Sequence, residues 1–275
     1  MNSTGIRPEP GISSSALVTR PARYELPQAH SDRSLLFRAP LILIRSVKPM
    51  QLAISILFDL NKIEPKDPIV PEPTEFRAIP FSFTWNVQTQ RDGSLQVGNE
   101  DRVRIIWWEA VRKDSPPKID EKRAAYVNRL DLKVFLGAVL EKLGVREKEF
   151  HSFIEYWNVL FKTDFDPEEA PFLLIQLVEK KDLDQFLPRI KIKSKEAYFD
   201  LQRFYFLFKP VAAHSLCGLD PEDYFESLIQ SRFSLNAVID LGGEVVHSDE
   251  LKHSEGKSAA KEFIQQFIKK HVKIP

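Results

Sequence analysis

Apolar side chains recur at helical spacing in two neighbouring segments in the middle of the chain. The two stripes are separated by a short turn at Gly144, and they consist of Leu132, Phe135, Leu136, Val139, Leu140 and Leu143, then Phe150, Phe153, Ile154, Trp157, Leu160 and Phe161. Spacings of three and four residues predict amphipathic helices, and a glycine after the last apolar position predicts a left-handed cap. We therefore expect a helical hairpin over about 131–162, with stripes that face each other or share one sheet.

Short apolar or alternating runs elsewhere predict β-strands. These runs are Leu41–Ile44, Ala53–Phe58, Phe81–Val87, Ser94–Val97, Val103–Trp108, Phe172–Val178, Arg189–Lys193, Phe204–Phe208 and Phe233–Leu241. Arg91-Asp92-Gly93 between two of them is typical of a hairpin turn. Five prolines between residues 62 and 80 predict an extended connection with at most an edge strand.

Three of these segments and one helix start carry more detailed expectations. Arg189–Lys193 alternates basic and apolar residues, which favours an edge strand guarded by lysines against aggregation. Phe204–Phe208 is apolar throughout and predicts a central strand covered on both faces. Gly242-Gly243 is expected to close the last strand, and Asp220 before Pro221 is expected to cap a helix.

These elements predict an α+β fold with a mostly antiparallel, sandwich-like β domain, an inserted helical hairpin and a C-terminal amphipathic helix. Residues 1–34 lack a periodic apolar face and predict a flexible N-terminal arm. Residues 35–246 form the expected β-rich core domain, with the hairpin inside it. Residues 247–275 predict a polar linker and a helix with the stripe Ala260, Phe263, Ile264, Phe267 and Ile268.

Composition narrows the classes of function. The 39 basic and 39 acidic side chains cancel, so no global charge draws the protein to nucleic acid or to an anionic membrane. One cysteine, Cys217, excludes an internal disulfide and a cysteine-ligated zinc cluster. Charges and prolines interrupt the most apolar stretch, 35–60, and the N-terminus lacks the apolar run of a secretory signal. We expect an intracellular protein without a transmembrane segment, in an undetermined compartment.

Candidate catalytic groups are few, and each has a structural explanation. His247 and His253 lie six residues apart, which puts them on different faces of a helix, so no metal or cofactor is expected. Glu109 follows two tryptophans and could act as an acid with a raised pKa, although aromatic packing explains the tryptophans better. His214, Ser215 and Cys217 lack a strand–elbow–helix context. No catalytic residue is predicted.

The colinear order of several short motifs resembles an uncharacterised, mainly bacterial protein family. The motifs are Trp85-Asn86-Val87, Trp107-Trp108-Glu109-Ala110, Phe153-Ile154-Glu155-Tyr156-Trp157 and Asp240-Leu241-Gly242-Gly243. Family members show W-x-V, F-W-E-G, F-I-x-Y-W-x-P and V-E-W-G-G, without an assigned activity. The resemblance implies a compact, mostly β domain. The chain departs from these patterns at Ala110, at Asp240-Leu241 and after Trp157, so a site built on those positions in relatives is expected to be lost here.

A non-catalytic binding or structural module, a subunit of a larger protein assembly, accounts best for these features. Partner contacts are expected from the two ends of the chain, at Tyr24, Leu26, Phe263, Phe267, Lys269 and Lys270. A hydrolase that uses carboxylates near Glu109 is the first alternative. An RNA-binding component of a ribonucleoprotein is the second, because basic patches occur at 189–195 and on the terminal segment.

Overall fold

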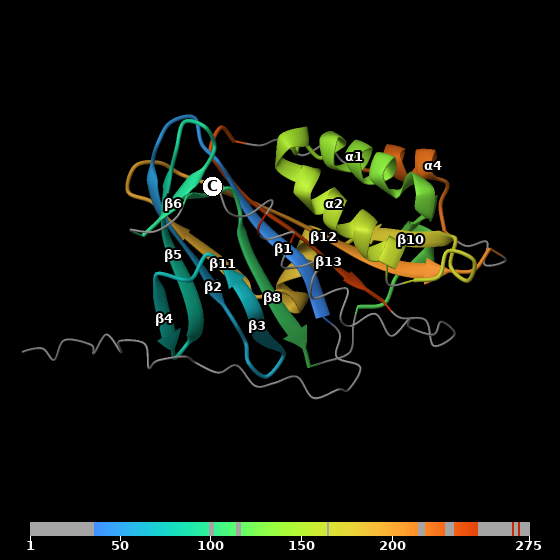
Figure 1. The fold of residues 1–275 in the computed structure, drawn as a ribbon, viewed down its shortest axis with the longest axis horizontal. Coiled ribbons are helices and arrows are strands. Elements are labelled where there is room, and N and C mark those ends of the chain that lie inside the picture. Colours follow the sequence, from blue (N-terminus) through green and yellow to red (C-terminus); the bar gives the residue numbers. More distant parts are fainter. Residues whose placement is uncertain are drawn as a thin grey trace, which may run out of the picture. The chain divides into compact units, whose positions relative to one another are not determined.

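Two β-sheets form the framework of the protein (Figure 1). The computed structural model describes residues 36–98, 102–113, 117–163, 165–213, 218–228 and 234–246, together with Gln266 and Lys269. The seven-stranded sheet has the order β3 (Ile63–Val70), β8 (Ile106–Arg112), β1 (Leu36–Arg45), β13 (Ala237–Val245), β12 (Asp200–Val211), β10 (Phe172–Leu177) and β9 (Ala125–Asn128). Its strands pair antiparallel except β12 and β13, which run parallel.

The six-stranded sheet has the order β11 (Arg189–Lys193), β2 (Gln51–Leu57), β5 (Phe81–Thr89), β6 (Leu95–Val97) and β7 (Arg102–Val103), with β4 (Glu75–Ala78) paired to β5. The helices are α1 (Leu132–Lys142), α2 (Glu147–Thr163), α3 (Lys180–Phe186) and α4 (Pro221–Ser227), and two 3-10 turns span Glu121–Arg123 and Arg129–Asp131. The predicted fold class is confirmed: the protein is a mixed α+β fold with two largely antiparallel, sandwich-like sheets.

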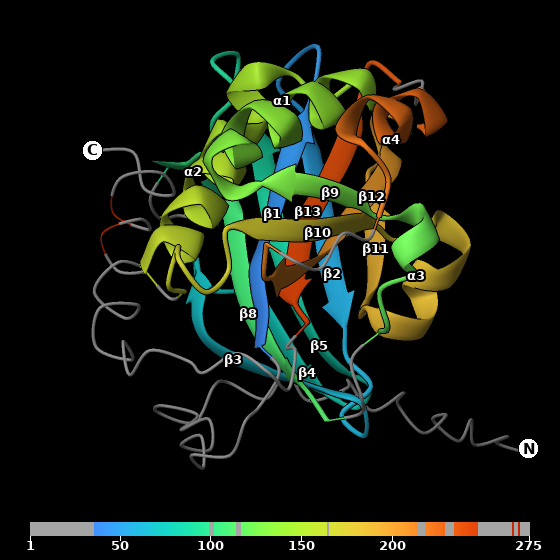
Figure 2. The ribbon, with the colours of Figure 1, turned by 90° about the vertical axis from the view of Figure 1, so that its right-hand side faces the viewer.

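The seven-stranded sheet is the middle layer of the fold. In β8, Trp107 packs on Tyr156 of α2 with ring centroids 5.3 Å apart, whereas Trp108 packs on Phe58 after β2 at 5.7 Å. Successive side chains of a strand point to opposite faces, so one face of this sheet carries α2 and the other carries the six-stranded sheet. Figures 1 and 2 show the same order, with β2 and β5 beyond β1 and β8 as seen from the helices.

The predicted helical hairpin is confirmed as α1 and α2. Gly144 between them has a φ of 82°, and its N–H donates to the carbonyl of Glu141. Both apolar stripes are buried: Leu136, Val139 and Leu140 of α1, and Phe153 and Trp157 of α2, have no exposed surface. The Trp157 ring lies 4.2 Å from the Phe208 ring of β12, so α2 is packed directly on the middle sheet.

Several other expectations are confirmed. Strand β12 lies inside its sheet, and Phe206 and Phe208 are fully buried. Strand β11 is an edge strand, as its alternating lysines predict. Strands β5 and β6 form the hairpin around Gly93, and Asp220 accepts a hydrogen bond from the N–H of Glu222 at the start of α4.

Other expectations are wrong. The segment 103–108 is two strands, β7 and β8, which belong to different sheets. Gly242-Gly243 does not end β13, which continues to Val245. The glycine at 243 serves packing instead, because a Cβ atom there would lie 2.7 Å from the Trp157 ring. The proline-rich connection contains two edge strands, β3 and β4, and the sequence pattern also misses β9 and α3.

The predicted N-terminal arm, 1–34, and most of the predicted linker and terminal helix, 247–275, lie outside the described residues. Among the residues that the structure describes, no helix is both long enough and apolar enough to cross a membrane.

Candidate binding surfaces

A chain of buried charges lies on the face of the middle sheet that is opposite to α2. Arg112 of β8 donates to Glu244 of β13 at 3.5 Å and to the carbonyl of Phe186 in α3 at 3.2 Å. The Tyr205 hydroxyl of β12 donates to the same Glu244 carboxylate at 3.2 Å. Burial, and then the neighbouring Glu244 charge, raise the pKa of Tyr205 well above its ordinary value. The Arg112 and Glu244 side chains have no exposed surface, so this group is closed to a substrate.

A second buried ion pair lies on the same face of the middle sheet. The Nε of Arg203 in β12 donates to Oδ2 of Asp240 in β13 at 2.9 Å, and both side chains are almost fully buried. Burial raises the pKa of the Asp240 carboxyl, and the Arg203 guanidinium lowers it again in part. Within the described residues, Asp240 Oδ1 and Arg203 Nη2 have no hydrogen-bond partner. The pair joins β12 to β13 inside the fold and offers no open site.

The carboxylate of the hydrolase alternative, Glu109, lies in β8 and is 8% exposed. It lies opposite Lys66 of the edge strand β3 and on the same face as Trp107, whereas Trp108 points to the other face. The two tryptophans therefore pack into two different layers, and they do not enclose Glu109 together.

Across the described ranges, no three His, Cys, Asp or Glu side chains are grouped as metal ligands.

Most of the residues that we predicted to contact partners cannot be compared with the structure. Lys269 is exposed, whereas Tyr24, Leu26, Phe263, Phe267 and Lys270 lie outside the described residues. The same holds for the histidines and nucleophiles considered above, His214, Ser215, Cys217, His247 and His253. Partner contacts at the chain ends therefore remain a prediction.

Three exposed apolar side chains come from three loops that meet at one end of the middle sheet. Val47 is 62% exposed, Leu235 is 73% exposed and Tyr198 is 80% exposed. The loops are joined through Asn236, whose side-chain oxygen accepts from the N–H of Val47 and whose carbonyl accepts from the N–H of Asp200. We call these three residues the apolar row.

The strand register explains why the three residues lie together. Ala237 of β13 lies opposite Arg45 of β1 on one side and opposite Asp200 of β12 on the other. Two residues beyond these pairs, each strand has turned into its loop at Val47, Leu235 and Tyr198. Arg45, the last residue of β1, lies on the α2 side of the sheet, where it donates to Glu149. It also donates to the carbonyl of Gly144 at 3.1 Å, so the loop that carries Val47 begins beside the α1–α2 turn.

The outer face of the six-stranded sheet is polar and basic. The cations at its outward positions are Arg77 of β4, Arg102 of β7, and Arg189, Lys191 and Lys193 of β11. Glu75 is the acidic residue among the outward positions of the described strands, and it accepts a hydrogen bond from Asn86 at 2.9 Å. These outward positions carry no aromatic side chain in the described part of the sheet.

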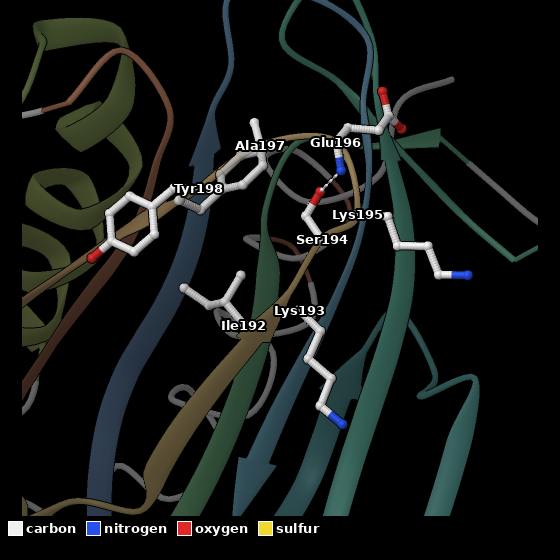
Figure 3. A pocket seen from close by; sticks show the side chains of 8 residues that line it. Ile192, Lys193, Ser194, Lys195, Glu196, Ala197 and Tyr198 are labelled. Atoms are coloured by element: carbon white, nitrogen blue, oxygen red, sulfur yellow. Dashed lines mark hydrogen bonds between the residues drawn. The ribbon is translucent and has the colours of Figure 1, made fainter.

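Two shallow depressions meet at the loop that follows β11. One, of about 800 Å³, extends over Gln51, Asn86, Gln88 and Gln96, and the other is lined by residues 192–199. Both include the segment 193–196. In Figure 3 the Lys193 and Lys195 side chains point to one side of this segment, and the Tyr198 ring points to the other. The two lysines therefore belong to the basic face, and Tyr198 belongs to the apolar row.

Hydrogen bonds hold this loop on β2. The Ser194 hydroxyl donates to the carbonyl of Gln51 at 2.9 Å, and the N–H of Gln51 donates to the Glu196 carboxylate at 2.9 Å. The Glu196 N–H donates in turn to the Ser194 hydroxyl (Figure 3). The polar atoms of Ser194 and Glu196 are thus used in positioning the loop.

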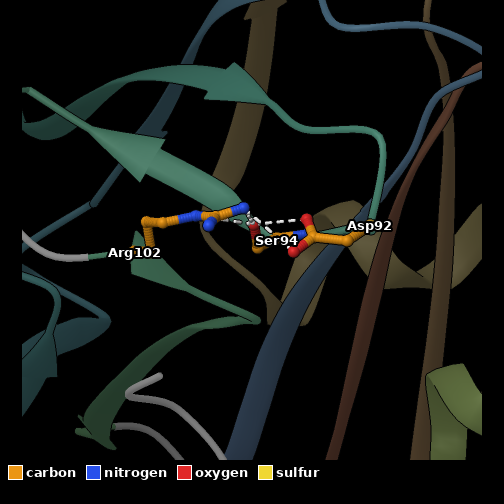
Figure 4. Close-up of polar contacts among 3 residues, drawn as sticks. All are labelled: Asp92, Ser94 and Arg102. Carbon is orange, nitrogen blue, oxygen red and sulfur yellow. Dashed lines mark hydrogen bonds and ion pairs between the residues drawn. The ribbon is translucent and has the colours of Figure 1, made fainter. Parts of the chain in front are cut away.

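A polar cluster at the β5–β6 turn has a structural role (Figure 4). The Ser94 hydroxyl donates to Asp92 at 2.6 Å, and Arg102 of β7 donates to both Asp92 and Ser94 at 2.9 Å. Hydrogen bonds from the Ser94 side chain and backbone, and then the Arg102 charge, hold the pKa of Asp92 below its ordinary value. The cluster ties β7 to the hairpin and lacks the base that an activated serine requires.

Sequence reasoning missed the apolar row, and no periodic signal could have revealed it. Val47 stands between Ser46 and Lys48 and Leu235 between Ser234 and Asn236, whereas Tyr198 lies in the short apolar run 197–199, which shows no periodicity. The strand register alone brings them together.

Comparison with protein-family models, with curated proteins and with solved structures gave no match.

Proposed function

We propose that this protein is a non-catalytic binding or structural module that serves as a subunit of a larger protein assembly. The observation that carries the proposal is the apolar row. Single exposed apolar residues are common on any protein surface, but three on loops that leave neighbouring strands at one end of a sheet favour a contact surface. Tyrosine is also among the residue types that most often anchor protein interfaces.

The rigid support of the row favours the same function. Its three loops continue β1, β12 and β13, which are interior strands of the middle sheet. Loops that are anchored at such strands lose less conformational freedom when a partner binds, and this lowers the entropic cost of binding. The two buried ion pairs of the middle sheet have almost no exposed surface, so they offer no open site for a substrate.

Purification of tagged protein from its native cells, with native mass spectrometry of the chains that it retains, tests this proposal. Tyr198→Asp combined with Leu235→Asp should weaken partner retention about tenfold or more, because loss of an interface anchor costs about 2 kcal/mol. Both positions are exposed, so the unfolding midpoint should not change. Leu130→Asp is the matched control: Leu130 is 84% exposed and lies at the start of the helical layer, so partner retention should persist.

The proposal would be wrong if the wild-type protein is monomeric and carries no other chain at its cellular concentration. Loss of retention in Leu130→Asp to the same degree would also contradict it, because the effect would then not depend on the apolar row.

A further inference from the structure

Strand β11 lies at the edge of the six-stranded sheet, and its inward-facing side chains are incompletely covered. Among the described strands it pairs with β2 alone, so every second backbone N–H and C=O along its other edge is directed away from the sheet. Ile190 and Ile192 of β11 are partly exposed, although Ile56 and Ile54, directly opposite in β2, have no exposed surface. One more strand beside β11 would cover these two isoleucines and extend the apolar layer between the sheets.

The outward-facing side chains of β11 are positively charged at regular spacing. Arg189, Lys191 and Lys193 occupy alternate positions, all three are exposed, and Lys195 follows in the loop. Alternate residues of a strand lie about 6.6 Å apart. Directly opposite residues of two paired strands approach to about 5 Å, where opposite charges attract and like charges repel. A neighbour with acidic residues at its outward positions would therefore be favoured.

We propose that β11 is the docking edge for an extended segment of another protein chain, in which acidic residues alternate with apolar ones. The segment adds as a strand to the six-stranded sheet. Its acidic side chains lie beside Lys191 and Lys193, its apolar side chains cover Ile190 and Ile192, and its backbone pairs with the free edge. This surface shares no residue with the apolar row, so the inference stands or falls independently of the proposed function.

Two other occupants fit the edge less well. A second copy that pairs through its own β11 would place cations opposite cations, which opposes the contact. Single-stranded nucleic acid is usually held by aromatic side chains on which the bases stack. The outward positions of the described strands of this sheet carry none.

The probe is a fluorescein-labelled peptide of about eight residues, a usual strand length, in which glutamate alternates with valine. Its binding to the full-length protein is measured by fluorescence anisotropy at low ionic strength. A peptide with lysine in place of glutamate should not bind. A peptide with N-methyl groups on alternate backbone nitrogens keeps the charge but cannot pair along an edge. Its affinity should therefore be lower by a factor of about ten or more.

Variants of the protein locate the contact. Lys191→Glu combined with Lys193→Glu should weaken binding about tenfold or more, because two favourable cross-strand charge pairs become unfavourable. The matched control is Lys133→Glu with Lys148→Glu, which makes the same change of charge at exposed positions of α1 and α2 and should leave binding unchanged. If the first variant does not fold, Lys191→Gln with Lys193→Gln tests the same contact without charge reversal.

Three results would overturn the inference. The peptide does not bind; the N-methylated peptide binds equally well, which would make the contact a charge effect without strand addition; or a single-stranded oligonucleotide of equal charge binds more tightly and displaces the peptide. The last result would assign the basic face to nucleic acid.

Discussion

Individual residues show how closely the helical layer is packed on the middle sheet. A Cβ atom at Gly243 of β13 would lie 2.7 Å from the Trp157 ring, 2.9 Å from the Phe206 carbonyl and 2.9 Å from the Phe208 ring. Backbone and rigid rings surround this position, so no flexible side chain can give way. The glycine in β13 is there because the tryptophan needs its space.

Gly243→Ala should therefore lower the free energy of unfolding by about 1–3 kcal/mol, the usual cost of overpacking. Gly137→Ala in α1 is the control, since its Cβ would meet Ile154 at an ordinary 3.8 Å. Alanine favours a helix over glycine, so this change should stabilise by up to about 1 kcal/mol. Urea unfolding curves measure both changes, and the prediction fails if the two have the same sign.

Asp240 should make stability depend on pH. Its carboxyl has an ordinary pKa of 3.8, which burial raises in the folded protein. From pH 3.8 up to the raised pKa, the folded state binds more protons than the unfolded state, so the free energy of unfolding falls as the pH rises. Asp240→Asn removes this contribution, and the stability of the wild type relative to the variant should decrease across that window. An increase would show that attraction to Arg203 outweighs burial.

At the scale of elements, the α1–α2 hairpin depends on a few fixed points. Gly144 provides the left-handed turn, and Arg45 of β1 binds both the Gly144 carbonyl and Glu149 of α2. The Trp157 ring packs on Phe208 of β12 at a tilt of 30° and stacks on Phe161 of α2. The hairpin is thus attached to the sheet by an ion pair at its turn and by aromatic contacts along α2.

Trp157→Ala should lower the free energy of unfolding by about 3–5 kcal/mol, because it leaves a cavity at the centre of this contact. Trp157→Phe should cost less, since the indole N–H has no hydrogen-bond partner among the described residues. Lys148→Ala, at an exposed position of the same helix, should change stability by less than about 0.5 kcal/mol. An unchanged urea midpoint in Trp157→Ala would contradict the assignment of this ring to the core.

At the scale of the whole molecule, the middle sheet supports both of its neighbours. Alternate side chains of β8 serve the helical layer and the six-stranded sheet. In the same way β12 presents Phe206 to α2 and Tyr205 to the buried charges on the other face. Neither outer layer can keep its apolar side buried without this sheet.

Hydrogen exchange should follow this arrangement. Strands β1, β12 and β13 lie inside the middle sheet, whereas β3, β9 and β11 lie at edges. Interior strands open only with large parts of the fold, so their amides should exchange about a hundredfold or more slowly than those of the edge strands. Mass spectrometry of peptides from partly exchanged protein measures this, and equal rates along β13 and β11 would contradict it.

The sequence by itself determined the local elements and the class of fold. Apolar residues at helical spacing around Gly144 are enough to predict the hairpin, because a helix buries one stripe whatever it packs on. The apolar run 204–208 and the alternating run 189–193 likewise predict a central and an edge strand, because burial on both faces or on one face leaves its own pattern.

Tertiary structure alone decided which sheet each strand joins and which distant residues meet. The change of sheet between Val103 and Ile106 leaves no periodic signal, and neither does the requirement that Trp157 places on Gly243. The apolar row is assembled from Val47, Tyr198 and Leu235 by strand register. Register depends on contacts between residues far apart in the chain, and local patterns of polarity do not encode which partner a strand will take.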